Sequence, residues 1–440
     1  MPLDIVNLTS IPITLEVKKK TGRGDRITIP AHGLVEVNKP KHGFSLDSWD
    51  LNAASLEKTD ASENSALLGP ATHTFSLKRP LGFGAMIQML TGPNACPWRV
   101  YKCKVGSRRT IYIVKKRDMR SFLSGLPDSM SLADVCLPGT HDTMAFYGWP
   151  ISQCQASDTP LSAQLQQGIR ILDIRLAVIK GRLIAYHGVY SQRSTFASIL
   201  ATLCTFLNSA ASRRETLIVS IKQEDRGGDF SRLVREEIEQ GPGGIRLWWL
   251  ENRIPTLGEV RGKAIMFSRF GGNGADWPGG LEGMGIHPTT WPDSAKEGFE
   301  WWCKNTMVRT QDWYSIPSFL DIPEKTALAV EVLRPPEQAP MQVLSISFFS
   351  ASSPLAVPPL VATGWGWPSV GLGVEGVNSR ISRFLLTQLG KVARPAESDE
   401  EPKTPVNEPI LRGWTFIDFY RLPSGSAIVP LLVECNFLGR

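Results

Sequence analysis

Histidine, carboxylate and arginine side chains lie at the ends of three short apolar runs near the middle of the 440-residue chain. The first run ends in His141 and Asp142, the second in Asp173 and Arg175, and the third in His187. Imidazole groups titrate near neutrality and can therefore take up or release a proton. A planar guanidinium can stabilise the negative charge that grows on phosphoryl oxygens. Together these residue types suit the acid–base cleavage of a phosphodiester.

The elements that would position these residues alternate between apolar strands and helical stretches from about residue 120 onward. Apolar runs predict eight strands, at residues 133–137, 169–174, 183–187, 217–221, 264–267, 307–310, 343–348 and 414–419. Intervening patterns predict helices, among them residues 161–167, 195–207, 230–239, 323–333 and 379–389. This alternation predicts an α/β fold, namely a TIM-type (β/α)8 barrel that allows for distortion.

Polar residues also follow the other predicted strands, where a barrel of this type places its active site. One histidine or lysine alone is more often a structural residue than a catalyst. Polar residues at seven of the eight strand ends instead indicate a shared site, because the C-terminal ends of parallel strands meet at one rim. The further residues at these ends are Lys222, Arg269, Gln311, Asp312 and Asp418.

Residues 1–118 follow a different pattern, in which short β-prone runs are separated by Gly, Pro and Asn. This regular spacing of short runs predicts a small β-sandwich. It would form an accessory domain before a catalytic domain at residues 119–440. The segment contains 18 Lys and Arg against 10 Asp and Glu, whereas the whole chain carries a net charge of +6. A basic domain fits an anionic membrane surface or nucleic acid, and a solubilising role explains the same charge equally well.

The composition excludes several other classes of protein. The seven cysteines show no CxxC or zinc-finger spacing, so neither a disulfide framework nor a structural zinc site is expected. No apolar run approaches the roughly 20 residues that span a bilayer, and the first residues lack the pattern of a secretory signal. We therefore expect an intracellular protein that is soluble or peripheral to a membrane. The acidic, Pro-rich residues 393–409 are predicted to form a disordered insert.

Residues 126–437 resemble the catalytic X-domain of the bacterial-type phosphatidylinositol-specific phospholipase C family. The resemblance implies a TIM-type barrel that cleaves phosphatidylinositol to diacylglycerol and a cyclic inositol phosphate. Each matching stretch alone is moderately specific, whereas their combination in the family's order is highly specific. The stretches are LPGTHDT, GIRILDIR, YHG, ETLIVSIKQE, IPTLGEVRGKAIMFSRF, QDWY and GWTFIDFY.

The resemblance implies a role for each histidine and for its carboxylate partner. His141 matches the base that takes the proton of the inositol 2-hydroxyl, and Asp418 matches the carboxylate that orients this base. His187 matches the acid that protonates the departing diacylglycerol oxygen, with Asp142 as its partner. Because the 2-hydroxyl attacks the phosphorus from within the substrate, the enzyme needs no nucleophile of its own.

Arg175 matches the residue that contacts the phosphate. Asp173, two residues earlier on the same face of the strand, would pair with it. Calcium-dependent relatives place carboxylates where a calcium ion bridges the phosphate, whereas Arg175 would supply positive charge directly. The resemblance therefore implies a reaction without a metal ion or other cofactor. The residues that match the lining of the inositol pocket are Lys222, Arg269, Asp312 and Tyr314.

Two alternatives remain open, a phosphodiesterase for another phospholipid and a non-catalytic lipid-binding protein on the same scaffold. The first usually needs a metal-binding carboxylate cluster, and the presence of both histidines and both carboxylate partners opposes the second. We expect phosphatidylinositol and a membrane surface as partners, and no nucleic acid. Trp365 and Trp367, on the predicted rim, either insert into the bilayer interface or pack within the protein. The oligomeric state and the acceptance of phosphorylated inositides stay open.

Overall fold

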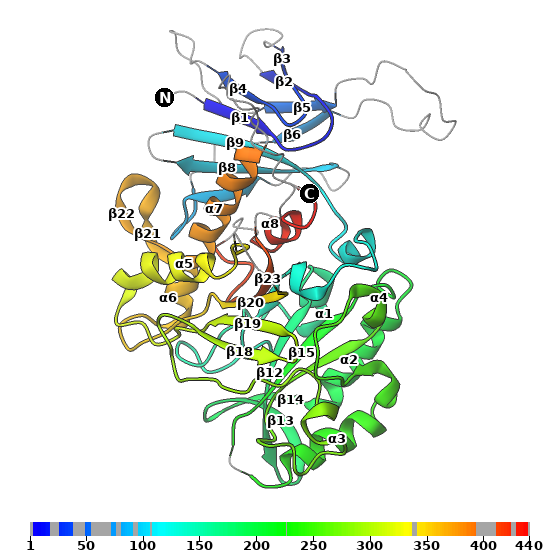
Figure 1. Ribbon diagram of the computed structural model, residues 1–440. Helices are drawn as coiled ribbons and strands as arrows, with labels where there is room; N and C mark the ends of the chain where they lie inside the picture. The colour runs from blue at the N-terminus through cyan, green and yellow to red at the C-terminus, as the bar shows by residue number, and fades with distance from the viewer. Residues whose placement is uncertain are drawn as a thin grey trace, which may run out of the picture.

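The structure is a computed structural model of the 440-residue chain. It describes residues 3–17, 26–37, 49–53, 72–75, 81–90, 96–105, 108–225, 227–336, 341–392, 411–423 and 428–438. The insert predicted at residues 393–409 lies outside these ranges. Figure 1 shows β-sheets from the N-terminal residues above a larger body of sheets and helices. Among the described residues, no helix combines the length and the apolar character needed to cross a membrane.

The N-terminal residues form two β-sheets that share a core. One sheet has the strand order β4-β1-β9-β8-β7, and the other has the order β3-β2-β5-β6. Residues of both sheets, including Ile5, Ile13 and Trp98, belong to one buried cluster. The strands are β1 (Leu3–Asn7), β2 (Ile13–Val17), β3 (Arg26–Ile29), β4 (Leu34–Val37), β5 (Trp49–Ala53), β6 (Thr72–Phe75), β7 (Ile87–Leu90), β8 (Trp98–Val105) and β9 (Arg108–Lys115).

The five-stranded N-terminal sheet is buried on its second face as well. Val6 and Tyr112 belong to the same buried cluster as Leu385 and Leu389 of the larger body. Alternate residues of β1 and β9 therefore contact different cores, which explains why successive residues of each strand are buried without alternation.

Parallel strands form the centre of the larger body. One sheet has the order β10-β23-β20-β19-β18, and the other has the order β14-β13-β12-β15-β17-β16 with β11 attached to β12. A two-stranded hairpin, β21–β22, lies apart from both. The strands are β10 (Cys136–Leu137), β11 (Gly139–Thr140), β12 (Ile171–Ile179), β13 (Arg182–His187), β14 (Tyr190–Thr195), β15 (Leu217–Gln223), β16 (Trp248–Trp249), β17 (Ala264–Arg269), β18 (Phe299–Cys303), β19 (Thr306–Gln311), β20 (Val343–Phe348), β21 (Gly364–Trp367), β22 (Leu372–Glu375) and β23 (Gly413–Phe416).

Strands β10 and β11 are two short strands that follow one another along the chain and are separated by Pro138. The first pairs with β23 and the second with β12, so this segment joins the two sheets. Gly139 is needed at the junction, because a Cβ atom there would lie 2.4 Å from the Thr415 carbonyl oxygen. The chain that leaves the junction carries His141 and Asp142 directly to the ends of the neighbouring strands.

The structure differs from the predicted eight-stranded barrel in two respects. The strand predicted at residues 183–187 is β13, which pairs antiparallel with β12 instead of continuing a parallel barrel. Lys180 and Gly181 between them have positive φ, as a two-residue hairpin turn requires. The described residues also leave the barrel open, because no pairing joins β16 to β18. The α/β arrangement of mixed sheets is therefore confirmed, whereas the sheets do not close into a barrel within the described residues, and the finer assignment to a distorted TIM-type barrel stays a prediction.

Helices cover the outside of these sheets (Figure 1). In α2, Thr195 accepts a hydrogen bond from the Ser198 backbone at the first turn, and the buried Ile199, Leu203 and Phe206 recur on one face. Five helices correspond to predicted ones, and none of their ends is shifted by more than three residues. The helices are α1 (Leu161–Gln166), α2 (Phe196–Asn208), α3 (Phe230–Gln240), α4 (Leu257–Val260), α5 (Ile322–Glu331), α6 (Pro358–Thr363), α7 (Val377–Val392) and α8 (Ile428–Glu434).

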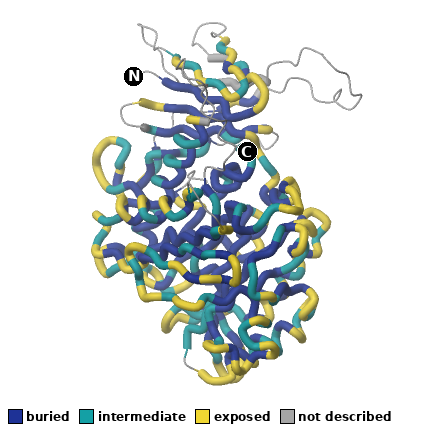
Figure 2. Tube along the Cα trace, viewed as in Figure 1, coloured by how far each residue is buried: buried dark blue, intermediate teal, exposed yellow. Residues whose placement is uncertain are grey.

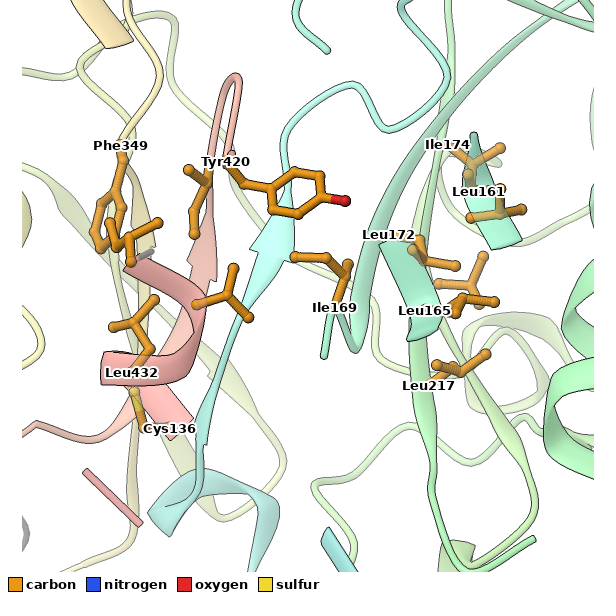
Figure 3. Packing of buried hydrophobic residues seen from close by; sticks show 14 of the residues in the cluster. Cys136, Leu161, Leu165, Ile169, Leu172, Ile174, Leu217, Phe349, Tyr420 and Leu432 are labelled. Atoms are coloured by element: carbon orange, nitrogen blue, oxygen red, sulfur yellow. The ribbon is translucent and has the colours of Figure 1, made fainter. Parts of the chain in front are cut away.

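Two buried clusters of the larger body support the strand ends. Figure 2 shows buried residues through the middle of the body and exposed residues in its outer loops. In Figure 3, Leu172 of β12 lies beside Leu161 and Leu165 of α1, and all three belong to the main buried cluster. Because side chains alternate along a strand, the outward packing of Leu172 turns Asp173 and Arg175 towards the barrel interior.

Candidate active site

One cavity of about 860 Å³ opens at the C-terminal ends of the parallel strands. Eight of the ten predicted site residues line it, and the other two, Asp142 and Asp173, are buried beside it. The structure therefore brings together residues that the sequence separates by up to 277 positions. The eight lining residues are His141, Arg175, His187, Lys222, Arg269, Asp312, Tyr314 and Asp418.

His141 is held by a carboxylate at one ring nitrogen and by an arginine at the other. Its Nδ1 lies 2.8 Å from Asp418 Oδ1, and its Nε2 lies 2.6 Å from Arg175 Nη2. Because a guanidinium can only donate, Nε2 must accept, and the ring proton on Nδ1 is donated to Asp418. The Gln155 side chain donates to the carbonyl oxygens of His141 and Ile417 and fixes the backbone here. The imidazole is therefore fixed in the tautomer that can act as a base through Nε2.

Arg175 lies among three carboxylates. Its Nε is 3.1 Å from Asp173 Oδ2 and 3.8 Å from Asp142 Oδ2, and its Nη1 is 3.6 Å from Glu224 Oε1. Asp173 also accepts from Arg269 Nη1 at 3.4 Å. Burial alone would raise the pKa of Asp173, but Arg175 and Arg269 outweigh it and hold the pKa below its ordinary value. Asp173 is therefore an ionised anchor for both guanidinium groups.

His187 ends β13 and contacts three groups through Nδ1. This atom lies 2.8 Å from the Ser152 carbonyl oxygen, 3.1 Å from Asp142 Oδ2 and 3.7 Å from Cys154 Sγ. The Ser152 contact has hydrogen-bond geometry, whereas Asp142 Oδ2 has no hydrogen-bond partner in the part of the chain that the structure describes. The Asp142 backbone, with a φ of 36°, is anchored because its amide donates to Asp173 at 3.0 Å.

Burial dominates the protonation equilibria of the four central groups. Burial, followed by the charge of Arg175, holds the pKa of His141 well below 6.5 and lowers the pKa of His187 to about 4. Burial also raises the pKa values of Asp142 and Asp418 well above their ordinary range. Near pH 7 both imidazoles are therefore neutral. His141 is ready to accept a proton, whereas His187 needs added negative charge nearby before it can donate one.

The outer part of the cavity alternates hydrogen-bond donors and acceptors. The Arg269 guanidinium lies 4.1 Å from the centre of the Trp291 ring, and Trp291 Nε1 donates to Asp312 Oδ2 at 2.9 Å. The Tyr314 hydroxyl donates to Asp293 at the rim, and this bond raises the pKa of Tyr314 to about 12. Such an alternation of fixed polar groups can bind a ring that carries several hydroxyls.

Glu224 is a site residue that the sequence interpretation did not select. Its Oε1 lies 3.1 Å from Lys222 Nζ, and its Oε2 accepts from the Gly188 backbone at 3.3 Å. Glu224 follows Lys222 by two residues, just as Arg175 follows Asp173, so the sequence did carry a pattern that could have identified Glu224 as a site residue. No comparable signal marked Trp291 or Asp293, because both follow β17 in a long connection whose path depends on tertiary packing.

Two groups of side chains in the site offer possible metal ligands. One contains His141, Cys154 and Asp418, and the other contains Asp142, Cys154 and His187, with ligand atoms within 4.8 Å of one another in each. Neither suits calcium, which takes six to eight oxygen ligands, because each group has one carboxylate. That the reaction needs no metal ion stays a prediction.

Comparisons with known proteins point to one group of enzymes. The 1-phosphatidylinositol phosphodiesterase of Listeria monocytogenes is 32% identical over 162 residues, which are 34% of this chain and 48% of that protein. The Staphylococcus aureus (strain Newman) enzyme of the same name is 27% identical over 185 residues, or 40% of this chain and 58% of that protein. The chain thus matches about half the length of these relatives, and no family model matches it.

A comparison of structures finds similarity over a longer part of the chain than the comparison of sequences does. A solved structure of the S. aureus phosphatidylinositol-specific phospholipase C superposes with a TM-score of 0.54 and 20% identity, over 73% of this chain and 98% of that one. At this identity the superposition shows the fold alone. The chain is therefore similar to bacterial phosphatidylinositol phosphodiesterases in sequence over about a third of its length, and it shares their α/β fold over about three quarters.

Proposed function

We propose that the chain cleaves phosphatidylinositol to diacylglycerol and a cyclic inositol phosphate by acid–base catalysis. One observation carries this proposal. His141 and His187, with ring centroids 6.4 Å apart, line one cavity with Arg175 beside them, and each imidazole has a carboxylate at Nδ1. The sequence similarity to 1-phosphatidylinositol phosphodiesterases supports the same substrate.

In the first half of the reaction, His141 Nε2 takes the proton of the inositol 2-hydroxyl while the oxygen attacks the phosphorus. Asp418, 2.8 Å from Nδ1, stabilises the imidazolium that forms. Arg175 Nη2 occupies Nε2 before the substrate binds, so it must turn away to release this nitrogen. The phosphoryl oxygens attract the guanidinium and provide the reason for this movement.

In the second half, the bond between phosphorus and the diacylglycerol oxygen breaks, and His187 donates a proton to that oxygen through Nε2. The Ser152 carbonyl and Asp142 at Nδ1 stabilise its charged form. The negative charge of the bound phosphate raises the lowered pKa of His187. His187 therefore gains a proton when the substrate binds, and it can then donate a proton to the leaving oxygen.

The outer cavity would hold the inositol ring, and the surrounding surface would contact the membrane. Lys222, Arg269, Asp312 and Tyr314 supply the donors and acceptors for the ring hydroxyls. Ile151 lines the cavity and is 67% exposed, which places an apolar side chain at the entrance to the site. We place the chain at a membrane surface as a peripheral protein.

Trp365 and Trp367 add a second exposed apolar group. Their side chains are 59% and 54% exposed, and both rings lie edge-on to Phe83 of the N-terminal residues. Packing within the protein therefore accounts for only part of these rings, and their exposed parts extend the proposed membrane contact.

The test is cleavage of phosphatidylinositol by the purified chain in excess chelator, with the soluble product identified by phosphorus NMR. A cyclic inositol phosphate formed without added metal is the expected result. Turnover that appears only when calcium is restored would contradict the role of Arg175. Phosphatidylinositol binding without turnover under either condition would favour the lipid-binding alternative.

A further inference from the structure

We propose that Cys154 Sγ, His187 Nδ1 and Asp142 Oδ2 form a site for a zinc ion that reversibly switches off the acid of the reaction. The metal site itself rests on geometry alone, whereas its inhibitory effect rests on the proposed function. Asp142 and Cys154 lie in the connection between β11 and α1, and His187 ends β13; their three ligand atoms lie within 4.8 Å of one another.

The distances fit the edges of a zinc coordination tetrahedron. Zinc–ligand bonds of about 2.3 Å to sulfur and about 2.0–2.1 Å to nitrogen and oxygen give a nitrogen–sulfur edge of about 3.6 Å and a nitrogen–oxygen edge of about 3.3 Å. The observed separations from His187 Nδ1 are 3.7 Å to Cys154 Sγ and 3.1 Å to Asp142 Oδ2. A zinc ion would therefore fit with small side-chain movements, and water from the cavity would fill the fourth position.

A buried oxygen of Asp142 without a hydrogen bond also supports a cation site between these three residues. Asp142 is 1% exposed, and its Oδ2 makes no hydrogen bond within the described residues. Leaving a buried carboxylate oxygen without a hydrogen bond costs free energy, because water no longer solvates it. A cation bound between Asp142, His187 and Cys154 would satisfy this oxygen.

The alternative group of His141, Cys154 and Asp418 is less suitable. Both ring nitrogens of His141 are already engaged, Nδ1 by Asp418 at 2.8 Å and Nε2 by Arg175 at 2.6 Å. A metal ion there would have to break both contacts. At His187, one hydrogen bond from Nδ1 to the Ser152 carbonyl is lost instead.

Protons balance in the binding step. Burial raises the pKa of the Cys154 thiol, so the thiol proton leaves to solvent as the zinc–sulfur bond forms. The neutral His187 ring carries its single proton on Nδ1, which donates it to the Ser152 carbonyl, and this proton moves through solvent to Nε2 as the metal binds Nδ1, so the ring stays neutral. Arg175, 3.8 Å from Asp142 Oδ2, repels the ion and weakens its binding, which keeps the site reversible.

Zinc at Nδ1 prevents His187 from becoming an imidazolium. The ring can then no longer provide an acidic proton to the departing diacylglycerol oxygen, because metal binding and protonation compete for the same nitrogen. Zinc would therefore inhibit turnover without occupying the place of the inositol ring.

The direct test uses Co²⁺ in place of Zn²⁺ with the full-length chain, since tetrahedral Co²⁺ bound to thiolate has a strong near-ultraviolet charge-transfer band. We expect this band with one equivalent of Co²⁺, its loss on adding Zn²⁺, and its absence in Cys154→Ser. Cys204→Ser is the matched control, because Cys204 is a partly exposed free cysteine on α2. Absence of the band in the unaltered chain, or a band that persists in Cys154→Ser, would overturn the site.

The second test measures zinc inhibition of phosphatidylinositol cleavage in the two variants, each relative to its own rate without metal. We expect the zinc concentration for half-inhibition to rise at least tenfold in Cys154→Ser and to stay unchanged in Cys204→Ser. Equal inhibition of both variants would overturn the inhibitory mechanism. If the chain shows no turnover at all, the proposed function fails, and the cobalt spectrum still decides the metal site.

Discussion

Arg175 Nη2 lies 2.6 Å from His141 Nε2, so the guanidinium donates a hydrogen bond to the nitrogen that would take the substrate's proton. In the proposed reaction, this contact would keep the base neutral and covered until the substrate's phosphate draws the guanidinium away. The same side chain would therefore both protect the base and recognise the phosphate.

Arg175→Lys should lower kcat by about 10²–10³-fold, with a smaller change in KM. A lysine keeps the charge but cannot reach Asp173, Glu224 and the phosphate at once, because it lacks the planar fork of a guanidinium. The measurement is steady-state cleavage of a soluble short-chain phosphatidylinositol. Arg182→Lys on β13 is the control, and a loss of activity shared by both variants would contradict the role of Arg175.

Asp418→Asn should lower kcat by about 10²–10⁴-fold while substrate binding changes little. An amide cannot stabilise the imidazolium at Nδ1, and its NH₂ group favours the wrong tautomer of His141. The kinetic constants of the variant are compared with those of Asp158→Asn, which changes an exposed carboxylate that pairs with Arg421. Unchanged kcat in Asp418→Asn would show that His141 does not depend on this carboxylate.

Binding of a cyclic inositol phosphate, a diester that carries one fixed negative charge at this pH, should take up protons near pH 5.5. The pKa of His187 is lowered to about 4 by burial and Arg175, so His187 is mostly neutral at this pH without ligand. A bound phosphate raises this pKa, and His187 gains up to one proton between the free and bound values. Affinity should therefore rise as pH falls through this window.

Calorimetry in two buffers of different ionisation enthalpy counts the protons taken up. His187→Gln should remove the uptake, whereas His32→Asn, which changes a histidine in an N-terminal turn, should not. Proton uptake that is the same in His187→Gln as in the unaltered chain would assign the titration to another group.

Much of the site could be predicted because it depends on strand ends. A polar residue that belongs to a buried strand keeps its place whatever the details of the loops, and Asp173, Lys222 and Arg269, on β12, β15 and β17, are of this kind. Trp291 and Asp293 depend instead on how a long connection folds back over the cavity. Their partners are thus set by tertiary packing and not by local pattern.

The structure departs from the predicted barrel in the direction of one strand, because β13 pairs antiparallel with β12. Residues 183–187 have the same apolar alternation in a hairpin as in a barrel, so periodicity could not assign their direction. The local signal lay in Lys180 and Gly181, whose positive φ values allow the chain to turn back at once. The roles assigned to the ten site residues stay predictions until the variants are measured.

Arg170→Ala should destabilise the fold by about 3–5 kcal/mol, because it leaves Glu215 as an unpaired buried charge. Both side chains are fully buried, with Arg170 Nε 2.8 Å from Glu215 Oε2. Arg170 also donates to the carbonyl oxygens of Met119 and Arg120, so the pair ties the segment after β9 to the barrel. The measurement is urea unfolding of the full-length chain.

The double variant Arg170→Met with Glu215→Leu should recover part of the loss, because no charge is then left unpaired. Arg232→Ala, at an exposed ion pair with Glu236 on α3, is the control and should change stability by less than about 1 kcal/mol. A loss in Arg170→Ala as small as that of the control would mean that the buried pair adds little to the stability of this junction.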